Sequence, residues 1–468
     1  MATRVQVDRR MWIATTLVCA LGIACDPGEA NDEDFSESME EGDGNLGKAD
    51  DANGGESVSE PGQLRWSQMA GLQGAAEGLP LFVSNNPEHV EGYGILAGVP
   101  YPGLSLAGAQ RAPGAPQAQW SREIIDSRCS DGGMQEFGVY IAHILPGNLG
   151  DGRRLTLALV AQDDVEIKVR GSMGSTDWSE NGNLLTTRTD WLGAELAKDF
   201  FFRTDLATKT YNAKAGEMVE IASELALSLV EGRFHVEANG CVHPFTIAHS
   251  AGLGGVMPGH YAPGDVKWPG WFEGAGFGRA AGVYDGDQWN GEQTVTIRES
   301  KSVQGVGMLT ANDSNDALAR HEDSAEILFG NYGVLYEQTL NLDNQSGQCV
   351  DVNVDFVSYI DRKNSSERTP TVQFFRDTAG DDPPSMFWNG PVEAEIKDVS
   401  KLLYHPVLSY APTAAEEANP NLAMGSMRET IATLELQAGA DKEVTVRFPV
   451  PGYIVAPIAL TVQSQPCG

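Results

Sequence analysis

Short apolar runs, separated by turn residues, extend from Leu64 to the C-terminus and limit the folded body to a mainly β architecture. Val352, Val354 and Phe356 alternate with polar residues, so they share one face of a half-buried strand. The runs that predict strands are Leu79–Val83, Gly138–His143, Leu155–Ala161, Val165–Val169, Val219–Ala222, Arg233–Ala238, Phe245–His249, Gln293–Arg298, Gly305–Thr310, Tyr332–Leu342, Cys349–Tyr359, Val372–Phe375, Val392–Lys397, Thr430–Leu436, Glu443–Phe448 and Ile458–Val462.

Helical patterns are scarce. Asp190–Phe202 predicts a short helix with Asp190 as its N-cap. Residues 216–230 fit a helix through four apolar residues three or four positions apart, and they fit a pair of strands equally well. Many short strands with frequent glycine predict two β-sandwich-like lobes.

The chain divides into four predicted parts. Residues 1–24 are a signal peptide, 25–61 a lipidated cysteine with a disordered acidic linker, 62–278 a β-rich lobe, and 279–468 a β-sandwich lobe. Gly254–Gly291 is dense in glycine and tryptophan without clean periodicity, so we expect it to form the junction between the lobes.

The N-terminus indicates export. Arg4, Arg9 and Arg10 precede the apolar segment Met11–Ala24, which is too short to span a bilayer but suits a signal peptide. Two cleavage reactions compete before Cys25. The small residues at positions 22 and 24 suit ordinary signal peptidase, whereas 21–25 resembles a lipobox with glycine where leucine is expected.

The number of cysteines favours the lipoprotein alternative. Cys19 leaves with the signal peptide, and lipidation of Cys25 leaves four cysteines that can pair completely. An unmodified Cys25 leaves an unpaired thiol in an oxidising compartment. Of the three pairings open to the remaining four, similar spacing within each lobe favours Cys129 with Cys241 and Cys349 with Cys467.

The distribution of charge predicts the character of the segment after Cys25 and argues against nucleic acid as a partner. Residues 26–60 carry thirteen acidic side chains and one base, Lys48, with almost nothing to bury, which predicts a disordered tether. A cation-binding or partner-binding tail is the alternative. The whole chain has a formal charge of -33 and no basic run, which argues against nucleic acid as a partner.

No catalytic motif is present. The four histidines between residues 235 and 260 lack metal-ligand spacing, and HExxH, CxxC and GxSxG are absent. We therefore expect a structural or binding protein without an organic cofactor. An extracellular polysaccharide hydrolase with unidentified carboxylates is the alternative. Three acidic loops could supply oxygens to a structural Ca²⁺, although none matches an EF-hand: Asp285–Asp287, Asp313–Asp316 and Asp377–Asp382.

Aromatic residues near the junction are the candidate binding residues. Trp268 and Trp271 lie among glycines and prolines, and Tyr284 and Trp289 follow. Loop tryptophans can stack on sugar rings, and they can equally fill the core between the lobes. A glycan or an envelope protein is the partner that the first interpretation implies.

Three sequence segments carry a resemblance to a known family: LPLFVSNNPE from Leu79, followed by EGYGIL from Glu91; GVYDGDQWNG from Gly282; and GNYGVLY from Gly330. They resemble an uncharacterised family of exported proteins, common in cyanobacteria and known by a domain-of-unknown-function label. The resemblance extends over about residues 62–465 and implies an exported, mainly β, two-part body. It implies no activity and no catalytic residue. With the N-terminal features, it predicts a lipoprotein of the cell envelope, the outer membrane or the cell surface.

Overall fold

A computed structural model shows a mainly β protein. The chain divides into two compact units, Met1–Gly54 and Gly55–Gly468, and all the residues that the structure describes belong to the second unit. The residues that the structure describes are 71–85, 90, 94–99, 118–120, 129, 133–145, 152–176, 189–227, 229–250, 280–309, 315–321, 324–325, 327–328, 331–358, 387–388, 391–404, 408–409, 427–450 and 458–468. Signal peptide, Cys25, acidic tether and the predicted strand at 372–375 lie outside these ranges.

Eleven strands form the first sheet, which is built around the long strand β10 (Leu229–Ser250). Its first half pairs with β5 and β7, and its second half pairs with β6 and β3, with a register shift between Glu237 and Val242. The other strands are β2 (Leu81–Ser84), β3 (Gly94–Gly98), β4 (Ala118–Trp120), β5 (Met134–Ile144), β6 (Arg153–Ala161), β7 (Val165–Thr176), β8 (Lys209–Ala213), β9 (Met218–Leu225), β11 (Ala281–Tyr284) and β14 (Ala317–His321).

The second and third sheets enclose the core of the C-terminal part. The six-stranded second sheet contains β1 (Ala75–Glu77), β12 (Gln288–Ile297), β15 (Leu335–Asn344), β22 (Asp441–Pro449), β18 (Val392–Ile396) and β19 (Ser400–Tyr404). The four-stranded third sheet contains β13 (Ser302–Met308), β23 (Ile458–Pro466), β16 (Val350–Ser358) and β21 (Met427–Leu436). A short pair, β17 (Phe387–Trp388) with β20 (Leu408–Ser409), completes the described strands.

The alternation of apolar and polar residues along the strands explains why the second and third sheets pack face to face. Every second residue of β15 is buried, including Tyr336 and Leu340, and Val352 and Phe356 of β16 are fully buried as their period-two pattern predicts. These residues belong to one apolar cluster, which continues onto Tyr140 of the first sheet. The C-terminal sandwich and one face of the first sheet therefore share a core.

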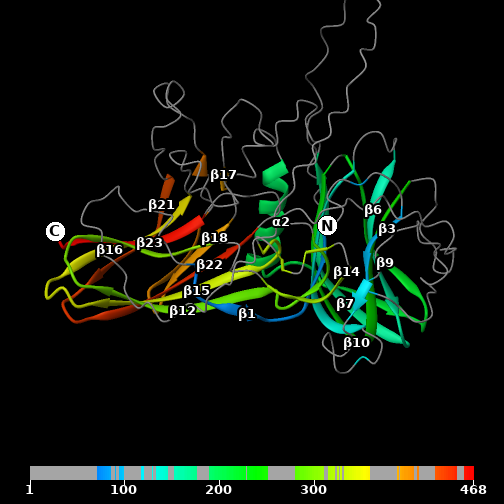
Figure 1. Cartoon of the computed structure of the whole chain (residues 1–468), viewed down its shortest axis with the longest axis horizontal. Helices are drawn as coiled ribbons and strands as arrows, with labels where there is room; N and C mark the ends of the chain where they lie inside the picture. Colours follow the sequence, from blue (N-terminus) through cyan, green and yellow to red (C-terminus); the bar gives the residue numbers. More distant parts are fainter. Residues whose placement is uncertain are drawn as a thin grey trace, which may run out of the picture. The chain divides into compact units, whose positions relative to one another are not determined.

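Strands cross the predicted boundary between residues 278 and 279. Strand β1 lies ahead of the boundary but pairs with β12 of the second sheet, as Figure 1 shows. Strands β11 and β14 lie behind it but pair in the first sheet, where β11 joins β2. Residue 278 itself lies outside the described residues. Because strands from each side of it pair in the other side's sheet, a division of the chain at this point does not coincide with a division between the sheets.

One α-helix is present among the described residues, α2 (Thr189–Phe202), which confirms the predicted helix at Asp190–Phe202. It packs on β7 and β10 of the first sheet, where the Arg170 guanidinium lies 4.9 Å from the centre of the Phe200 ring. Residues 218–225 form β9, so the strand alternative for 216–230 is confirmed. No helix in the described ranges has the length and apolarity needed to cross a membrane.

Candidate functional site

The face of the first sheet formed by β5 and β10 carries a group of buried and half-buried titratable side chains. Antiparallel pairing places Gly138 opposite His235 and Tyr140 opposite Arg233. Tyr140 belongs to the shared core, so this face turns inward at Tyr140 and Arg233. It reaches solvent at His235, whose side chain is 28% exposed.

Arg233 anchors the buried end of this face. Its Nη2 donates a hydrogen bond to the carbonyl of Val450 at 3.0 Å, and its guanidinium lies 4.8 Å from the centre of the Tyr140 ring. Burial lowers the pKa of Arg233, whereas Tyr140 and the neighbouring carboxylate of Glu231 raise it. A guanidinium held this way connects the first sheet to the end of β22 and is unavailable to a ligand.

Three titratable side chains, Glu136, His235 and Asp287, lie at the solvent end of the same face. His235 Nε2 is 3.3 Å from Glu136 Oε1, and Asp287 lies close enough to interact electrostatically with both. Burial raises the pKa of Asp287 and the charge of Glu136 adds to this rise, whereas the Leu79 hydrogen bond and His235 oppose it. The group combines one imidazole and two carboxylates at the edge of the sheet.

Two glycines make room for Asp287. Its Oδ1 accepts a hydrogen bond from the Leu79 N–H at 2.9 Å. A Cβ on Gly78 would lie 2.3 Å from that oxygen, and Gly78 has a φ of +87°, which favours glycine. A Cβ on Gly138 would lie 3.3 Å from Asp287 Oδ2, so this carboxylate fills the place of a side chain on β5.

A buried amide network lies beside Asp287. Asn331 Oδ1 accepts the Asn315 N–H at 2.8 Å, and Asn331 Nδ2 donates to the Tyr336 hydroxyl at 2.6 Å. Asn315 Nδ2 donates to the Gly286 carbonyl at 2.6 Å. Leu79, Gly286 and Asn331 each belong to one of the three sequence segments that carry the family resemblance. The hydrogen bonds around Asp287 and Asn315 therefore bring these segments together in space.

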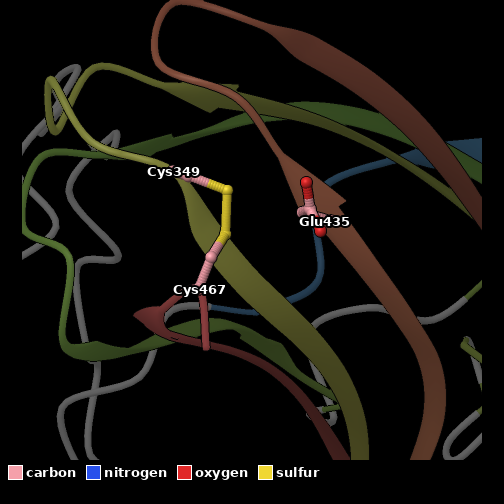
Figure 2. A group of neighbouring side chains, drawn as sticks. All are labelled: Cys349, Glu435 and Cys467. Carbon is pink, nitrogen blue, oxygen red and sulfur yellow. A yellow bond between two sulfur atoms is a disulfide. The ribbon is translucent and has the colours of Figure 1, made fainter.

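The two disulfides match the pairing that the spacing favours: Cys129 with Cys241, and Cys349 with Cys467. Their sequence separations of 112 and 118 residues correspond to about 4–5 kcal/mol each in the chain-entropy model. Figure 2 shows Glu435 of β21 beside the second bond. These three residues have the spacing of a metal site, but both sulfurs are bonded to each other and offer no thiolate.

We expect the two disulfides to differ in their rates of reduction. Cys129 and Cys241 are 3% and 7% exposed, whereas Cys349 and Cys467 are partly exposed. A reductant must reach a sulfur atom, so limited dithiothreitol followed by alkylation should label Cys349 and Cys467 first. Peptide mass spectrometry measures the order, and earlier labelling of Cys129 and Cys241 would contradict it.

Charged residues on the outer face of the second sheet bind each other. Arg447 Nη1 donates to Glu393 at 2.9 Å and to Glu395 at 2.7 Å, and Arg447 Nε donates to Glu337. Burial alone lowers the pKa of Arg447, but these hydrogen bonds raise it above its usual value. The network joins three neighbouring strands and is a structural feature.

For two of the four candidate aromatic residues, the structure supports packing in the core over ligand stacking. Tyr284 is fully buried and donates its hydroxyl proton to the Ala325 carbonyl at 2.8 Å. Trp289 is 8% exposed, and its ring centre lies 6.1 Å from that of Tyr336. Both lie on strands whose inward face packs in the core, so neither can stack on a ligand. Trp268 and Trp271 lie outside the described residues, as does Cys25.

Sequence reasoning missed two contacts between histidines and hydroxyl groups. His143 Nε2 lies 2.7 Å from Ser84 Oγ, and His249 Nε2 lies 2.8 Å from Thr156 Oγ1. All four residues are at least 96% buried, so these pairs satisfy polar groups inside the sheet layers. The sequence gives no local pattern for these contacts, because each pair joins two strands that are far apart in the chain.

Fold and site together define a mainly β, disulfide-bonded protein. Residues 267–464 match the family described as "Protein of unknown function (DUF3370)", a match to the C-terminal part of the chain. The wider extent of the predicted resemblance and its cyanobacterial distribution stay predictions. No curated protein matches the sequence.

Solved structures give weak matches. The CUB1-EGF-CUB2 domain of human MASP-1/3 is 11% identical, with 70% of this chain and 92% of that chain covered at a TM-score of 0.16. The same domains of rat MASP-1 are 9% identical, with 76% and 95% covered at 0.16. The Cry4Aa toxin from Bacillus thuringiensis is 6% identical, with 66% and 43% covered at 0.18. Scores this low establish no common fold.

Proposed function

We propose that this chain is exported and held at the cell envelope by a lipid on Cys25, where its β-rich body has a structural or binding role. The observation that carries the proposal is the pairing of Cys129 with Cys241 and of Cys349 with Cys467. Stable disulfides are typical of compartments outside the reducing cytoplasm.

The pairing also supports a modified Cys25. Both bonds together use every cysteine after the predicted signal peptide except Cys25. A lipid on its sulfur removes the one thiol that an oxidising compartment would otherwise leave unpaired. The acidic segment at 26–60 then serves as a tether of roughly 30–35 Å that holds the body away from the membrane.

A binding role agrees with the rigidity of the body. Two covalent cross-links and a core common to the three sheets give a fixed surface, on which a glycan or an envelope protein can bind without a large ordering cost. The acidic charge of the chain favours a partner that is neutral or cationic at its contact surface.

Replacing Cys25 with alanine should release the protein from the membrane. The lipid would be attached to this sulfur, so the Cys25→Ala chain should move from the membrane fraction to the soluble exported fraction of the producing cell. Immunoblotting of the fractions measures the change. Cys19→Ala is the matched control, because Cys19 lies within the apolar part of the signal and should leave anchoring intact.

Intact mass provides an independent check of the same proposal. The membrane-extracted protein should begin at Cys25, carry a lipid adduct and contain no alkylatable thiol before reduction. An unmodified N-terminus, or a Cys25→Ala chain that stays in the membrane fraction, would overturn lipid anchoring.

A further inference from the structure

We propose that reduction of the disulfide between Cys349 and Cys467 creates, together with Glu435, a binding site for Zn²⁺. A dithiol supplies the two electrons and two protons and is itself oxidised to a disulfide, which leaves two thiols on this chain. Binding of Zn²⁺ then releases both thiol protons, because the thiolate is the form of cysteine that binds a metal. The proposal does not depend on the anchoring of Cys25, since it concerns the third sheet alone.

The three donor groups already lie around one point. One Sγ from each cysteine and one carboxylate oxygen of Glu435 all lie within 4.8 Å of one another. Ligands bound to Zn²⁺ at about 2.0–2.3 Å in tetrahedral geometry lie about 3.5–3.8 Å apart. Cleavage of the bond between the sulfurs frees them to move apart to that separation, and the exposed Glu435 side chain can move toward them.

The sheet itself holds the backbone around the disulfide. Cys349 directly precedes β16, Cys467 directly follows β23, and Glu435 lies on β21, which pairs with the other side of β16 (Figure 2). The Cys467 N–H also donates to the Cys349 carbonyl at 3.2 Å, and the adjacent Val350 is fully buried in the apolar cluster. None of these contacts involves a sulfur atom, so the two cysteines stay next to each other after reduction.

Gln437 orients two of the three donors. Its Nε2 donates to Glu435 Oε1 at 2.6 Å and lies 3.5 Å from Cys349 Sγ. The amide nitrogen carries two protons, so it can donate to the carboxylate and to the thiolate at the same time. Hydrogen bonds of this kind fix the direction of ligating groups and are a regular feature of metal sites.

The local charge and the donor types favour Zn²⁺. Asp351 lies directly opposite Glu435 in the antiparallel pairing of β16 with β21, where like charges repel each other. Within the described part of the chain, Glu435 forms no ion pair that would offset this repulsion. Two thiolates add two negative charges, and they select Zn²⁺ over Ca²⁺ and Mg²⁺, which bind oxygen ligands. Three protein ligands leave a fourth position for water.

Titration of the reduced full chain with CoCl₂ and then with ZnCl₂ tests the site. Every sample carries Cys19→Ser and Cys25→Ser, and limited dithiothreitol opens the partly exposed disulfide before the reductant is removed without air. Co²⁺ reports the ligands, because a charge-transfer band between thiolate and Co²⁺ appears only when sulfur binds the ion. We expect one Co²⁺ per reduced chain, displaced by Zn²⁺, and no such band in the oxidised chain.

Two variants and one control isolate the donors. The double variant Cys349→Ser/Cys467→Ser should lose the band. Glu435→Gln should weaken Co²⁺ binding more than about tenfold, since changing even the groups around a ligand costs about 10–100-fold. Glu429→Gln is the matched control, because it removes another exposed carboxylate from β21 and should bind Co²⁺ as the parent does. Unchanged circular dichroism of the reduced chains checks that all of them stay folded.

The outcomes separate the alternatives. Absence of the band from the reduced parent chain would overturn the proposal. A band that persists in Cys349→Ser/Cys467→Ser would assign the binding to Cys129 and Cys241 and would overturn it too, as would equal affinity in Glu435→Gln and the parent. Loss in the double variant and weakening in Glu435→Gln, with Glu429→Gln unchanged, support it.

Discussion

The Phe448→Ala protein is expected to lose about 3–5 kcal/mol of unfolding free energy. Phe448 is fully buried, stacks on Tyr336 with ring centres 5.2 Å apart, and meets Phe356 edge-on at 5.3 Å. Removing the ring leaves a cavity where the second and third sheets face each other, and it also removes two aromatic contacts worth about 0.5–1.5 kcal/mol each.

Urea unfolding at constant pH measures this loss as a lower midpoint with an unchanged slope. Phe448→Leu is the control, because it keeps most of the apolar volume and should cost less than about half as much. A loss below about 1 kcal/mol in Phe448→Ala would show that this core can collapse around the missing ring.

Asn331→Ala is expected to lose about 3–7 kcal/mol of unfolding free energy, through lost hydrogen bonds and backbone strain. Asn331 is fully buried, and its amide bonds the Asn315 N–H and the Tyr336 hydroxyl. Alanine leaves both groups buried with that bond missing, at about 1–3 kcal/mol each. Asn331 also has a φ of +47°, a conformation that asparagine tolerates and alanine adopts at a cost of about 1 kcal/mol.

Asn331→Gly separates the two causes, since glycine relieves the backbone strain but restores neither hydrogen bond. We expect it to be more stable than Asn331→Ala by about 1 kcal/mol while remaining well below the parent chain. Equal stability of the glycine variant and the parent would show that the amide bonds contribute nothing.

Alternation allowed most of the C-terminal sheets to be predicted. In β15 every second residue is buried, and in β16 Val352, Val354 and Phe356 alternate with polar residues, so period two is visible in the sequence. Strand β10 covers two predicted strands, Arg233–Ala238 and Phe245–His249; between them lie Asn239 and Gly240, residue types common in turns, where the strand changes partners. Short strands such as β3 and β11 were missed because four or five residues are too few to show a period.

The candidate site could not be predicted in the same way. Asp287 lies beside Gly138 because a turn packs onto a strand, and the glycine makes that packing possible without any local sequence signal. For Tyr284 and Trp289 the sequence left two alternatives open, ligand stacking or packing in the core, because neighbouring glycines are compatible with both; both residues pack in the core. Cysteine pairing was predictable because it depended on spacing and number alone.

The exchange of strands between sheets governs the order in which the protein can assemble. Strand β2 emerges early during synthesis, but its partner β11 follows about 200 residues later, and β12, the partner of β1, is about as distant. Contacts this distant in sequence slow folding, and they leave the edge of the first sheet exposed until most of the chain has been delivered. The chain therefore needs protection from aggregation during that interval, and neither half can be expected to mature as an autonomous module.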